Sequence, residues 1–241
     1  MKTNLPCLLL VLISVSQFAQ AKNSKKWVSL FNGNNLDGWV VQSNPDDRLK
    51  HFWTVENGVI KADSSGSKQH DYIWLLSEKE YQDFELKLKF AAYRASKGNS
   101  GIQIRSRYDT DESWLDGPQI DIHTPNPYRT GMMWDETRGA RRWIYPDLPK
   151  GTWVKKEMAV SAPEFYYSDD ALKWNEMRVL VKGYKVKAWL NSALATDFDG
   201  ERILTSELHK KYNVGEKGHI ALQIHKKQEL KILFKDIYIK E

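Results

Sequence analysis

Cysteine is almost absent from this chain of 241 residues, and the single one, Cys7, lies within the first 21 residues. That segment has Lys2 near its start, an apolar run over residues 8–15 and the sequence Ala-Gln-Ala at residues 19–21. These features are typical of a secretory signal peptide, so residues 1–21 are expected to be removed on export to the periplasm or the medium. The mature protein then has no thiol nucleophile, no disulfide and no cysteine-ligated metal site.

Long apolar runs, clusters of one charge sign and flexible linkers are missing as well. The apolar run of the leader is too short for a permanent membrane span, and no second stretch suits one, so no membrane partner is expected after signal removal. The formal net charge of +5 is small and the two signs are interspersed, which argues against a nucleic-acid partner. Because no linker divides the chain, we expect residues 22–241 to form one domain.

Alternation of apolar and polar residues, the period of a β-strand, dominates the sequence. The turn Asn57-Gly58 predicts a hairpin over residues 53–62, and Gly183 marks a second hairpin over residues 177–190. Many antiparallel strands with few helices predict an all-β fold, a sandwich or jelly roll. The other expected strands are at residues 84–90, 101–105, 118–123, 221–225 and 231–239. The expected helices are short, at residues 78–82 and 206–212.

Tryptophan is abundant, with ten residues, and flat aromatic faces stack on sugar rings. This abundance indicates a carbohydrate ligand, although the simpler interpretation is that most of the tryptophans are core residues. Trp39 is expected in the core near the N-terminus. Trp134 lies in a charged segment and is the better candidate for stacking on a sugar.

Three of the expected strands have an unusual set of polar residues on one face. Residues i and i+2 of a strand share a face, so the intervening Ile and Leu residues are expected to form a core on the other side. Lysine and glutamate are absent from all seven polar positions, which argues against an ordinary solvated face. If the three strands share a sheet, these groups suit the hydroxyls of a sugar. The seven residues are Gln103 and Arg105, then Gln119, Asp121 and His123, then Gln223 and His225.

A segment rich in charged and aromatic residues follows at residues 128–143. Trp134, Asp135, Glu136 and Arg138 stand out in it. One interpretation is a surface loop of ion pairs. The other is the rim of a site, which supplies a carboxylate for acid–base work and an arginine for an oxyanion.

The ordinary retaining glycosidase mechanism needs two carboxyl groups about 5–5.5 Å apart. Retaining β-glucanases of the concanavalin-like fold carry them in a Glu-x-Asp-x-Glu strand, but the corresponding strand here supplies only Asp121. A second carboxyl from Asp135 or Glu136 is an option whose distance the sequence does not fix. The missing glutamates therefore disfavour double displacement.

Elimination is an alternative for a sugar with a ketone at C3, because the ketone acidifies the hydrogen at C2. This reaction needs a base, a donor for the enolate oxygen and an acid for the leaving group. The candidate base is His225 or Asp121, with His123 as a further candidate, and Glu136 or Asp135 would assist the leaving group. The residues expected to bind substrate are Gln103, Arg105, Gln119, Trp134, Asp135, Arg138 and Gln223.

Several motifs along the mature chain are shared with a known family. They are SLFNGNNLDGW at residues 29–39, YQDFEL at 81–86, GNSGIQIRS at 98–106, GPQIDI at 117–122, WDETRG at 134–139, WNEMR at 174–178, WLN at 189–191 and GHIALQIH at 218–225. With them the chain resembles the 3-keto-disaccharide hydrolase family. The resemblance implies a concanavalin A-like jelly roll of two antiparallel sheets, export, and action on glycosides or their 3-keto derivatives. Many members have glutamate in place of Gln119 and glutamine in place of Asp121.

Alternatives to this interpretation concern the protein class and the histidines. A non-catalytic carbohydrate-binding module or lectin on the same fold is the second hypothesis. No cofactor and no metal are expected. Asp121, His123 and His225 are in principle able to bind a divalent ion, but no close histidine spacing supports this. The histidines expected at the surface are His51, His70 and His209.

Overall fold

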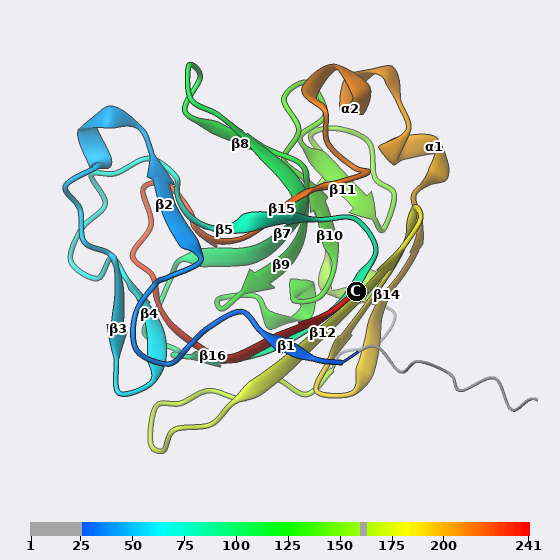
Figure 1. Ribbon diagram of the computed structural model, residues 1–241. Coiled ribbons are helices and arrows are strands. Elements are labelled where there is room, and N and C mark those ends of the chain that lie inside the picture. The colour runs from blue at the N-terminus through cyan, green and yellow to red at the C-terminus, as the bar shows by residue number, and fades with distance from the viewer. Residues whose placement is uncertain (1–25, 160–162) are drawn as a thin grey trace, which may run out of the picture.

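The computed structural model describes residues 26–159 and 163–241, which form two antiparallel β-sheets packed against each other (Figure 1). The first sheet has the spatial order β14 (Ala193–Asp199), β13 (Lys185–Leu190), β12 (Asn175–Lys182), β6 (Phe84–Ala92), β16 (Lys231–Lys240), β4 (Val59–Asp63) and β3 (Trp53–Glu56), with β1 (Val28–Ser29) beside β16. The second has the order β11 (Arg142–Tyr145), β10 (Met133–Asp135), β9 (Pro118–His123), β7 (Asn99–Asp109), β15 (Gly218–Ile224), β5 (Ile73–Tyr81) and β2 (Trp39–Ser43), with β8 (Trp114–Asp116) beside β7. The predicted all-β jelly-roll sandwich of two antiparallel sheets is confirmed.

Both predicted hairpins are present. Asn57 and Gly58 both have positive φ, 51° and 77°, which is the backbone that a two-residue hairpin turn needs between β3 and β4. Gly183, with φ 55°, lies in the turn that joins β12 to β13. Turn chemistry read from the sequence therefore sets the register of two hairpins of the first sheet.

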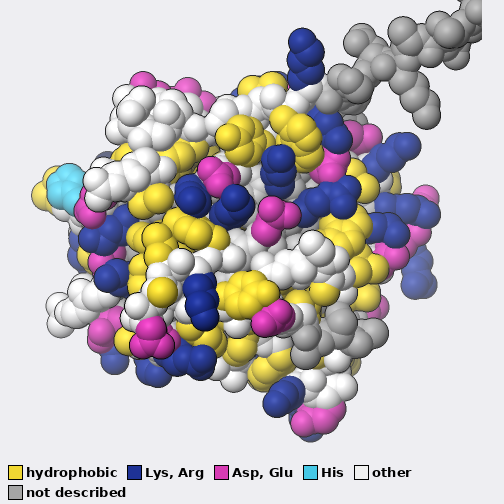
Figure 2. Space-filling model, turned by 90° about the horizontal axis from the view of Figure 1, so that it is seen from below, with side chains coloured by type: hydrophobic (Ala, Val, Ile, Leu, Met, Phe, Trp, Pro, Cys, Tyr) yellow, Lys and Arg dark blue, Asp and Glu magenta, His cyan; other side chains and the backbone are white. Residues whose placement is uncertain are grey.

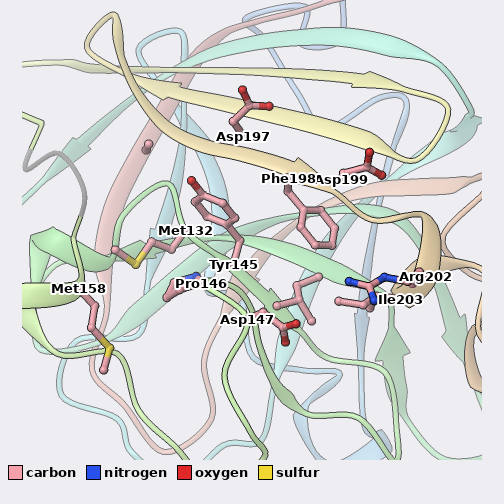
Figure 3. Close-up of a pocket in the computed structure, with 12 residues that line it drawn as sticks. Met132, Tyr145, Pro146, Asp147, Met158, Asp197, Phe198, Asp199, Arg202 and Ile203 are labelled. Atoms are coloured by element: carbon pink, nitrogen blue, oxygen red, sulfur yellow. The ribbon is translucent and has the colours of Figure 1, made fainter.

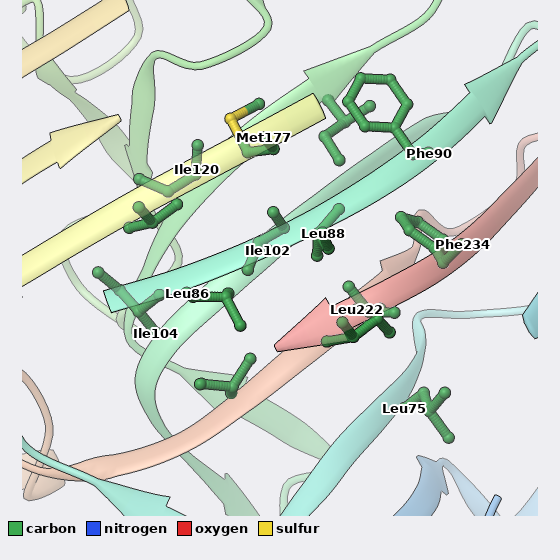
Figure 4. Packing of buried hydrophobic residues seen from close by; sticks show 14 of the residues in the cluster. Leu75, Leu86, Leu88, Phe90, Ile102, Ile104, Ile120, Met177, Leu222 and Phe234 are labelled. Atoms are coloured by element: carbon green, nitrogen blue, oxygen red, sulfur yellow. The ribbon is translucent and has the colours of Figure 1, made fainter. Parts of the chain in front are cut away.

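The core lies between the two sheets (Figure 4). Leu86 and Leu88 of β6 face Ile102 of β7, and all three are almost fully buried. Burial of each such side chain stabilises the fold by roughly 1.5–3 kcal/mol, so this layer supplies most of the driving force. Trp39 belongs to the same cluster, as predicted.

Helices are few and short. The structure has α1 (Glu201–Leu204), α2 (Glu207–Tyr212) and the 3-10 turns η1 (Pro45–Asp47), η2 (Pro127–Arg129) and η3 (Lys156–Met158). The predicted helix near residues 206–212 is confirmed by α2. It begins after Ser206, whose hydroxyl caps it by accepting from the backbone N–H of His209. The prediction of a helix at 78–82 is wrong: the segment continues β5, where Glu80 and Tyr81 pair with β15.

Two of the three histidines expected at the surface are buried. His209 of α2 is 1% exposed, with Nε2 at 3.1 Å from the Asp135 carboxylate. His70 is 5% exposed, with both ring nitrogens against backbone oxygens of Asp71 and Gln228. The prediction was wrong for both, because polar partners compensate the burial of the rings. Only His51 is exposed as expected.

The predicted signal peptide, residues 1–21, lies outside the described residues. Within residues 26–159 and 163–241, no helix is both long and apolar enough to cross a membrane. The face seen in Figure 2 has Lys and Arg interspersed with Asp, Glu and apolar side chains. Cross-strand ion pairs such as Lys89–Asp236 and Lys187–Asp197 fit this mixture.

Candidate active site

The three strands with the unusual polar residues are neighbours, in the order β9, β7, β15. Their polar side chains, apart from that of Arg105, lie on the face of the second sheet that is turned away from the core. A pocket of about 350 Å³ opens there. Six of the residues predicted for the site line it: Gln119, Asp121, His123, Trp134, Glu136 and His225. The lining residues that the sequence did not single out are Tyr72, Asn99, Arg129, Arg141, Trp143, Trp153 and Gln228.

A glycine in β7 makes room on the pocket floor. Gly101 lies directly opposite Asp121 in the β7–β9 ladder. A Cβ atom at Gly101 would come within 2.3 Å of Cδ of Gln119. The missing side chain therefore lets Gln119 lie across β7, where its amide reaches Asp121.

Asp121 is a buried carboxyl group with one oxygen free. Its Oδ1 accepts hydrogen bonds from Asn99 Nδ2 at 2.7 Å and from Gln119 Nε2 at 3.4 Å, while Oδ2 has no partner within the described part of the chain. Burial, with a smaller contribution from the charge of Glu136, raises the pKa of Asp121 from 3.8 to about 7. A carboxyl group with this pKa suits a general base near neutral pH.

Glu136 supplies a second carboxyl group to the pocket, directly after β10. Its Oε1 accepts a long hydrogen bond of 3.5 Å from Gln223 Nε2, and Oε2 is buried without a partner. Burial raises the pKa of Glu136, although the positive charge of Arg141 opposes this. The indole of Trp114 donates to the backbone oxygen of Glu136 and holds the segment in place. Glu136 is therefore placed as a candidate acid.

The two imidazoles of the pocket have opposite tautomers. The backbone N–H of Asn126 donates to His123 Nδ1 at 3.0 Å, so a neutral His123 carries its hydrogen on Nε2. His225 Nδ1 lies 3.0 Å from the backbone oxygen of Lys226, which only accepts, so Nδ1 carries the hydrogen there. The hydroxyl of Tyr72 then donates to His225 Nε2 at 3.0 Å. Burial is the main cause that lowers the pKa of each histidine to about 4, so both are neutral at pH 7.

Neither histidine has a free lone pair, since Asn126 uses that of His123 and Tyr72 uses that of His225. Of the three residues considered as the base, only Asp121 offers an unoccupied acceptor atom. The same contacts leave the histidines unsuited to hold a metal ion. Among residues 26–159 and 163–241, no three His, Cys, Asp or Glu side chains are grouped to bind one.

Unpaired acceptor oxygens accumulate on and under the pocket floor. Five buried side-chain oxygens lack a donor: Oε1 of Gln103, Gln119 and Gln223, Oδ2 of Asp121 and Oε2 of Glu136. An unsatisfied buried acceptor costs about 1–3 kcal/mol, so such a concentration is unusual in a purely structural role. A ligand rich in O–H donors would satisfy those that belong to residues lining the pocket, Gln119, Asp121 and Glu136.

Aromatic side chains form one wall of the pocket. Trp134 and Trp153 stack with ring centroids 5.6 Å apart and an interplanar angle of 9°, and Trp143 packs edge-on against Trp134. The Arg129 guanidinium lies 5.6 Å from the ring centroid of Trp153. Trp134 thus lines the pocket as the sequence predicted, but its contacts with Trp143 and Trp153 were not predicted.

The structure places three of the predicted substrate-binding residues away from the pocket. Arg105 has φ 49°, turns out of the polar face and is 1% exposed. Its guanidinium donates to backbone oxygens of Gln82, Gly183 and Gly215 and to Asp83. This corrects the expectation that it shares a face with Gln103.

Asp135 and Arg138 also have structural partners. Asp135 pairs with His209, and Arg138 forms ion pairs with both Asp116 and Asp109. Gln103 and Gln223 are fully buried beneath the pocket rather than on its surface.

A second cavity of about 570 Å³ opens between β14 and the segment after β11 (Figure 3). Its walls are mainly apolar, with Tyr145 and Phe198 among them. Of its carboxylates, Asp147 pairs with Arg142 and Asp197 with Lys187. It is larger than the polar pocket, but it has none of the predicted site residues and no comparable set of unpaired groups.

Known proteins resemble this chain in sequence and in fold. A 3-keto-disaccharide hydrolase of Bacteroides thetaiotaomicron is 21% identical over 223 residues, which cover 83% of this chain and 73% of the relative. A protein of Parabacteroides distasonis ATCC 8503, described as a "putative glycosyl hydrolase", shares the fold with a TM-score of 0.55 and 23% identity, covering 90% of this chain and 99% of that one. The carbohydrate-binding module CBM66 of Bacillus subtilis shares it with a TM-score of 0.52 and 14% identity, covering 85% and 96%.

The sequence profile of one family matches residues 26–240, almost the whole described chain. The chain therefore belongs to the family of 3-keto-alpha-glucoside-1,2-lyase-like domains.

Proposed function

We propose that this chain is an exported enzyme that cleaves the glycosidic bond of 3-keto-disaccharides or 3-keto-glycosides by base-initiated elimination, followed by hydration. The observation that carries the proposal is the free, buried Oδ2 of Asp121, on a carboxyl group whose pKa is about 7. Membership of the family and the name of the Bacteroides relative support the substrate class. The proposal includes a signal peptide at residues 1–21 and one domain over residues 22–241.

A carbohydrate is the ligand class that suits the floor of the pocket. Sugar hydroxyls donate hydrogen bonds, and the floor offers buried acceptors such as Gln119 Oε1 and Glu136 Oε2 that lack donors. The stacked pair Trp134 and Trp153 offers a flat apolar wall for a sugar ring. Polar floor and aromatic wall together suit a polyol ring with two chemically different faces.

The reaction needs one base and one acid. Asp121 Oδ2 takes the C2 hydrogen as a proton; the electrons of the C2–H bond form a C2=C3 double bond, and the carbonyl electrons move to the C3 oxygen. The enolate then re-forms the ketone, the electrons shift to make C1=C2, and the C1–O bond breaks. Protonated Glu136 gives its proton to the departing oxygen. Water next adds across C1=C2: its hydroxyl bonds to C1, its remaining proton goes to the Glu136 carboxylate, and Asp121, after exchanging its proton with solvent, protonates C2.

Double displacement is less well supported, although Glu136 does bring a second carboxyl group to the pocket. Double displacement needs one carboxyl group ionised as the nucleophile while the other is still protonated as the acid for the leaving group, which requires environments that push the two pKa values apart. Here burial raises the pKa of both Asp121 and Glu136. Elimination needs the same two protonation states, so the family match and the name of the Bacteroides relative are what favour it over double displacement.

A sugar-binding protein without catalysis is the second candidate function. The shared fold of CBM66 favours it, because that fold is compatible with binding alone. The two candidates differ in one property: a lectin returns its ligand unchanged.

The test is incubation of the purified protein with matched native and 3-keto disaccharides in heavy-oxygen water, with products followed by mass spectrometry. Cleavage of the keto form alone, with heavy oxygen at C1, supports the proposal. Cleavage of native disaccharides would favour the two-carboxyl mechanism. Binding without cleavage across the panel would favour the lectin.

A further inference from the structure

One end of the pocket offers hydrogen-bond donors, whereas the middle of the sheet offers acceptors. His123 ends β9 and lines the pocket. Its Nδ1 accepts from the backbone N–H of Asn126 at 3.0 Å, so the hydrogen of the neutral ring is on Nε2. In the part of the chain that the structure describes, that Nε2–H has no partner, so it is available to an acceptor in the pocket.

Arg129 places a second donor at the same end. It is the last residue of η2, the turn that packs after β9. Its Nη2 donates to the backbone oxygen of Val154 at 3.3 Å, and its guanidinium lies 5.6 Å from the ring centroids of both Tyr128 and Trp153. Its Nε is buried and has no acceptor within the described residues. An unpaired buried donor on a charged group is costly, so a ligand oxygen is the natural partner.

The His123 ring is suited to remain neutral while it donates. Burial and the positive charge of Arg129 both lower the pKa of His123, to about 4. A neutral imidazole keeps its N–H through the reaction and polarises a carbonyl without a proton transfer, the role that neutral histidine has in other enolising enzymes. Arg129 contributes the positive charge that a developing oxyanion needs.

Resting on the proposed elimination, we infer that His123 Nε2–H and Arg129 Nε–H bind the C3 ketone oxygen of the substrate and stabilise its enolate. His123 and Asp121 are two residues apart on one face of β9, which separates their Cα atoms by about 6.5 Å. With hydrogen-bond contacts of about 3 Å, that spacing fits a ketone oxygen at His123 and the neighbouring C2 at Asp121. The donor pair forms no covalent bond and loses no proton; it stabilises the negative charge on O3 until the ketone re-forms.

Two substitutions separate donation from a merely structural role of His123. In His123→Asn the side-chain Oδ1 takes the place of Nδ1 and still accepts from Asn126, but the donor at the position of Nε2 is lost. In His123→Gln the amide nitrogen reaches the position of Nε2 and keeps the donor, but the acceptor for Asn126 is lost. We expect His123→Asn to lower kcat about 100- to 1000-fold with little change in KM, and His123→Gln to retain more of it. The exposed His51→Gln is the matched control, with wild-type kcat and KM.

The reverse order would overturn the inference: an active His123→Asn with an impaired His123→Gln means that the turn at Asn126 is what matters. Arg129→Lys, which keeps the charge but not the Nε donor, is expected to lower kcat, and Arg129→Gln to lower it further. Wild-type kcat in Arg129→Gln would remove Arg129 from the donor pair. If the wild-type protein turns over no 3-keto-glycoside at all, the proposed function itself fails, which distinguishes the two failures.

A spectroscopic readout tests the contact without turnover. Asp121→Asn removes the base, so a 3-keto-disaccharide labelled with carbon-13 at C3 can be held in the pocket and its carbonyl stretch measured by infrared difference spectroscopy. We expect the stretch at a lower wavenumber than in water. The shift should be reduced in the double variant with His123→Asn and retained with His51→Gln. An identical carbonyl frequency with and without the His123 donor would contradict the assignment.

Discussion

Replacement of Asp121 by asparagine is expected to abolish turnover and at the same time to stabilise the protein above neutral pH. The protein environment raises the pKa of Asp121 from 3.8 to about 7, and this difference corresponds to about 4 kcal/mol. This is the largest amount by which the ionised Asp121 carboxylate can lower the free energy of unfolding. Asparagine keeps the shape and the Oδ1 acceptor for Asn99 but has no charge to desolvate.

The sign follows from the two protonation equilibria. Below about pH 4 the carboxyl group is protonated in the folded and the unfolded chain, so it adds no penalty. Between about pH 4 and pH 7 the unfolded chain has released the proton while the folded protein keeps it, so the free energy of unfolding of the wild type falls as pH rises. Above about pH 7 the penalty is complete. Stability gained by Asp121→Asn over the wild type should therefore grow from pH 5 to pH 8.

Urea denaturation followed by tryptophan fluorescence at pH 5 and pH 8 measures this gap, the difference in the free energy of unfolding between Asp121→Asn and the wild type. A constant cost from the new amide N–H at the position of Oδ2 cancels in the difference between the two pH values. Asp111→Asn, in an exposed turn, is the matched control and should show no pH-dependent gap. A gap of the same size at both pH values, or one that shrinks at pH 8, would refute the assignment of a raised pKa to Asp121.

Three further results are expected. The kcat/KM for a 3-keto-disaccharide should rise with pH around pH 7, as Asp121 ionises with its pKa of about 7; a kcat/KM that does not change around pH 7 would contradict its role as the base. Gly101→Ala should lower kcat/KM with an unchanged circular dichroism spectrum, because its Cβ would meet the Gln119 side chain at 2.3 Å; wild-type kcat/KM would mean that the position of Gln119 is immaterial. Arg105→Met should lower the free energy of unfolding by about 3 kcal/mol or more, since three backbone oxygens lose their donor, while kcat at low temperature persists; lost kcat in a fully folded variant would restore a substrate role to Arg105.

Strand alternation was enough to predict the sandwich and to group the polar face. Periodicity of two in β7, β9 and β15 placed Gln119, Asp121 and His123 correctly, because the strands are regular there. The same rule failed at Arg105, where a positive φ changes the direction of the side chain, and a sequence does not show such a bulge. Asn99 belonged to the alternating set, two residues before Gly101, and extending the strand by one step would have found it.

Other parts of the site depend on tertiary contacts that leave no local signal. Tyr72 directly precedes β5 and was not predicted for the site. Its hydroxyl nevertheless occupies the acceptor nitrogen of His225, Nε2. Trp153 reaches the pocket from a segment without regular strands. Glu136 was a candidate, but only the fold shows that it and not Asp135 enters the pocket, since Asp135 is turned toward His209.

The most direct test of the proposed elimination is deuterium incorporation at C2 of a 3-keto-disaccharide in heavy water, compared between the wild type and Asp121→Asn. Elimination with Asp121 as the base predicts deuterium at C2 of the released 3-keto-sugar with the wild type, and neither exchange nor cleavage with the variant. Cleavage by the wild type with ordinary hydrogen fully retained at C2 would contradict it.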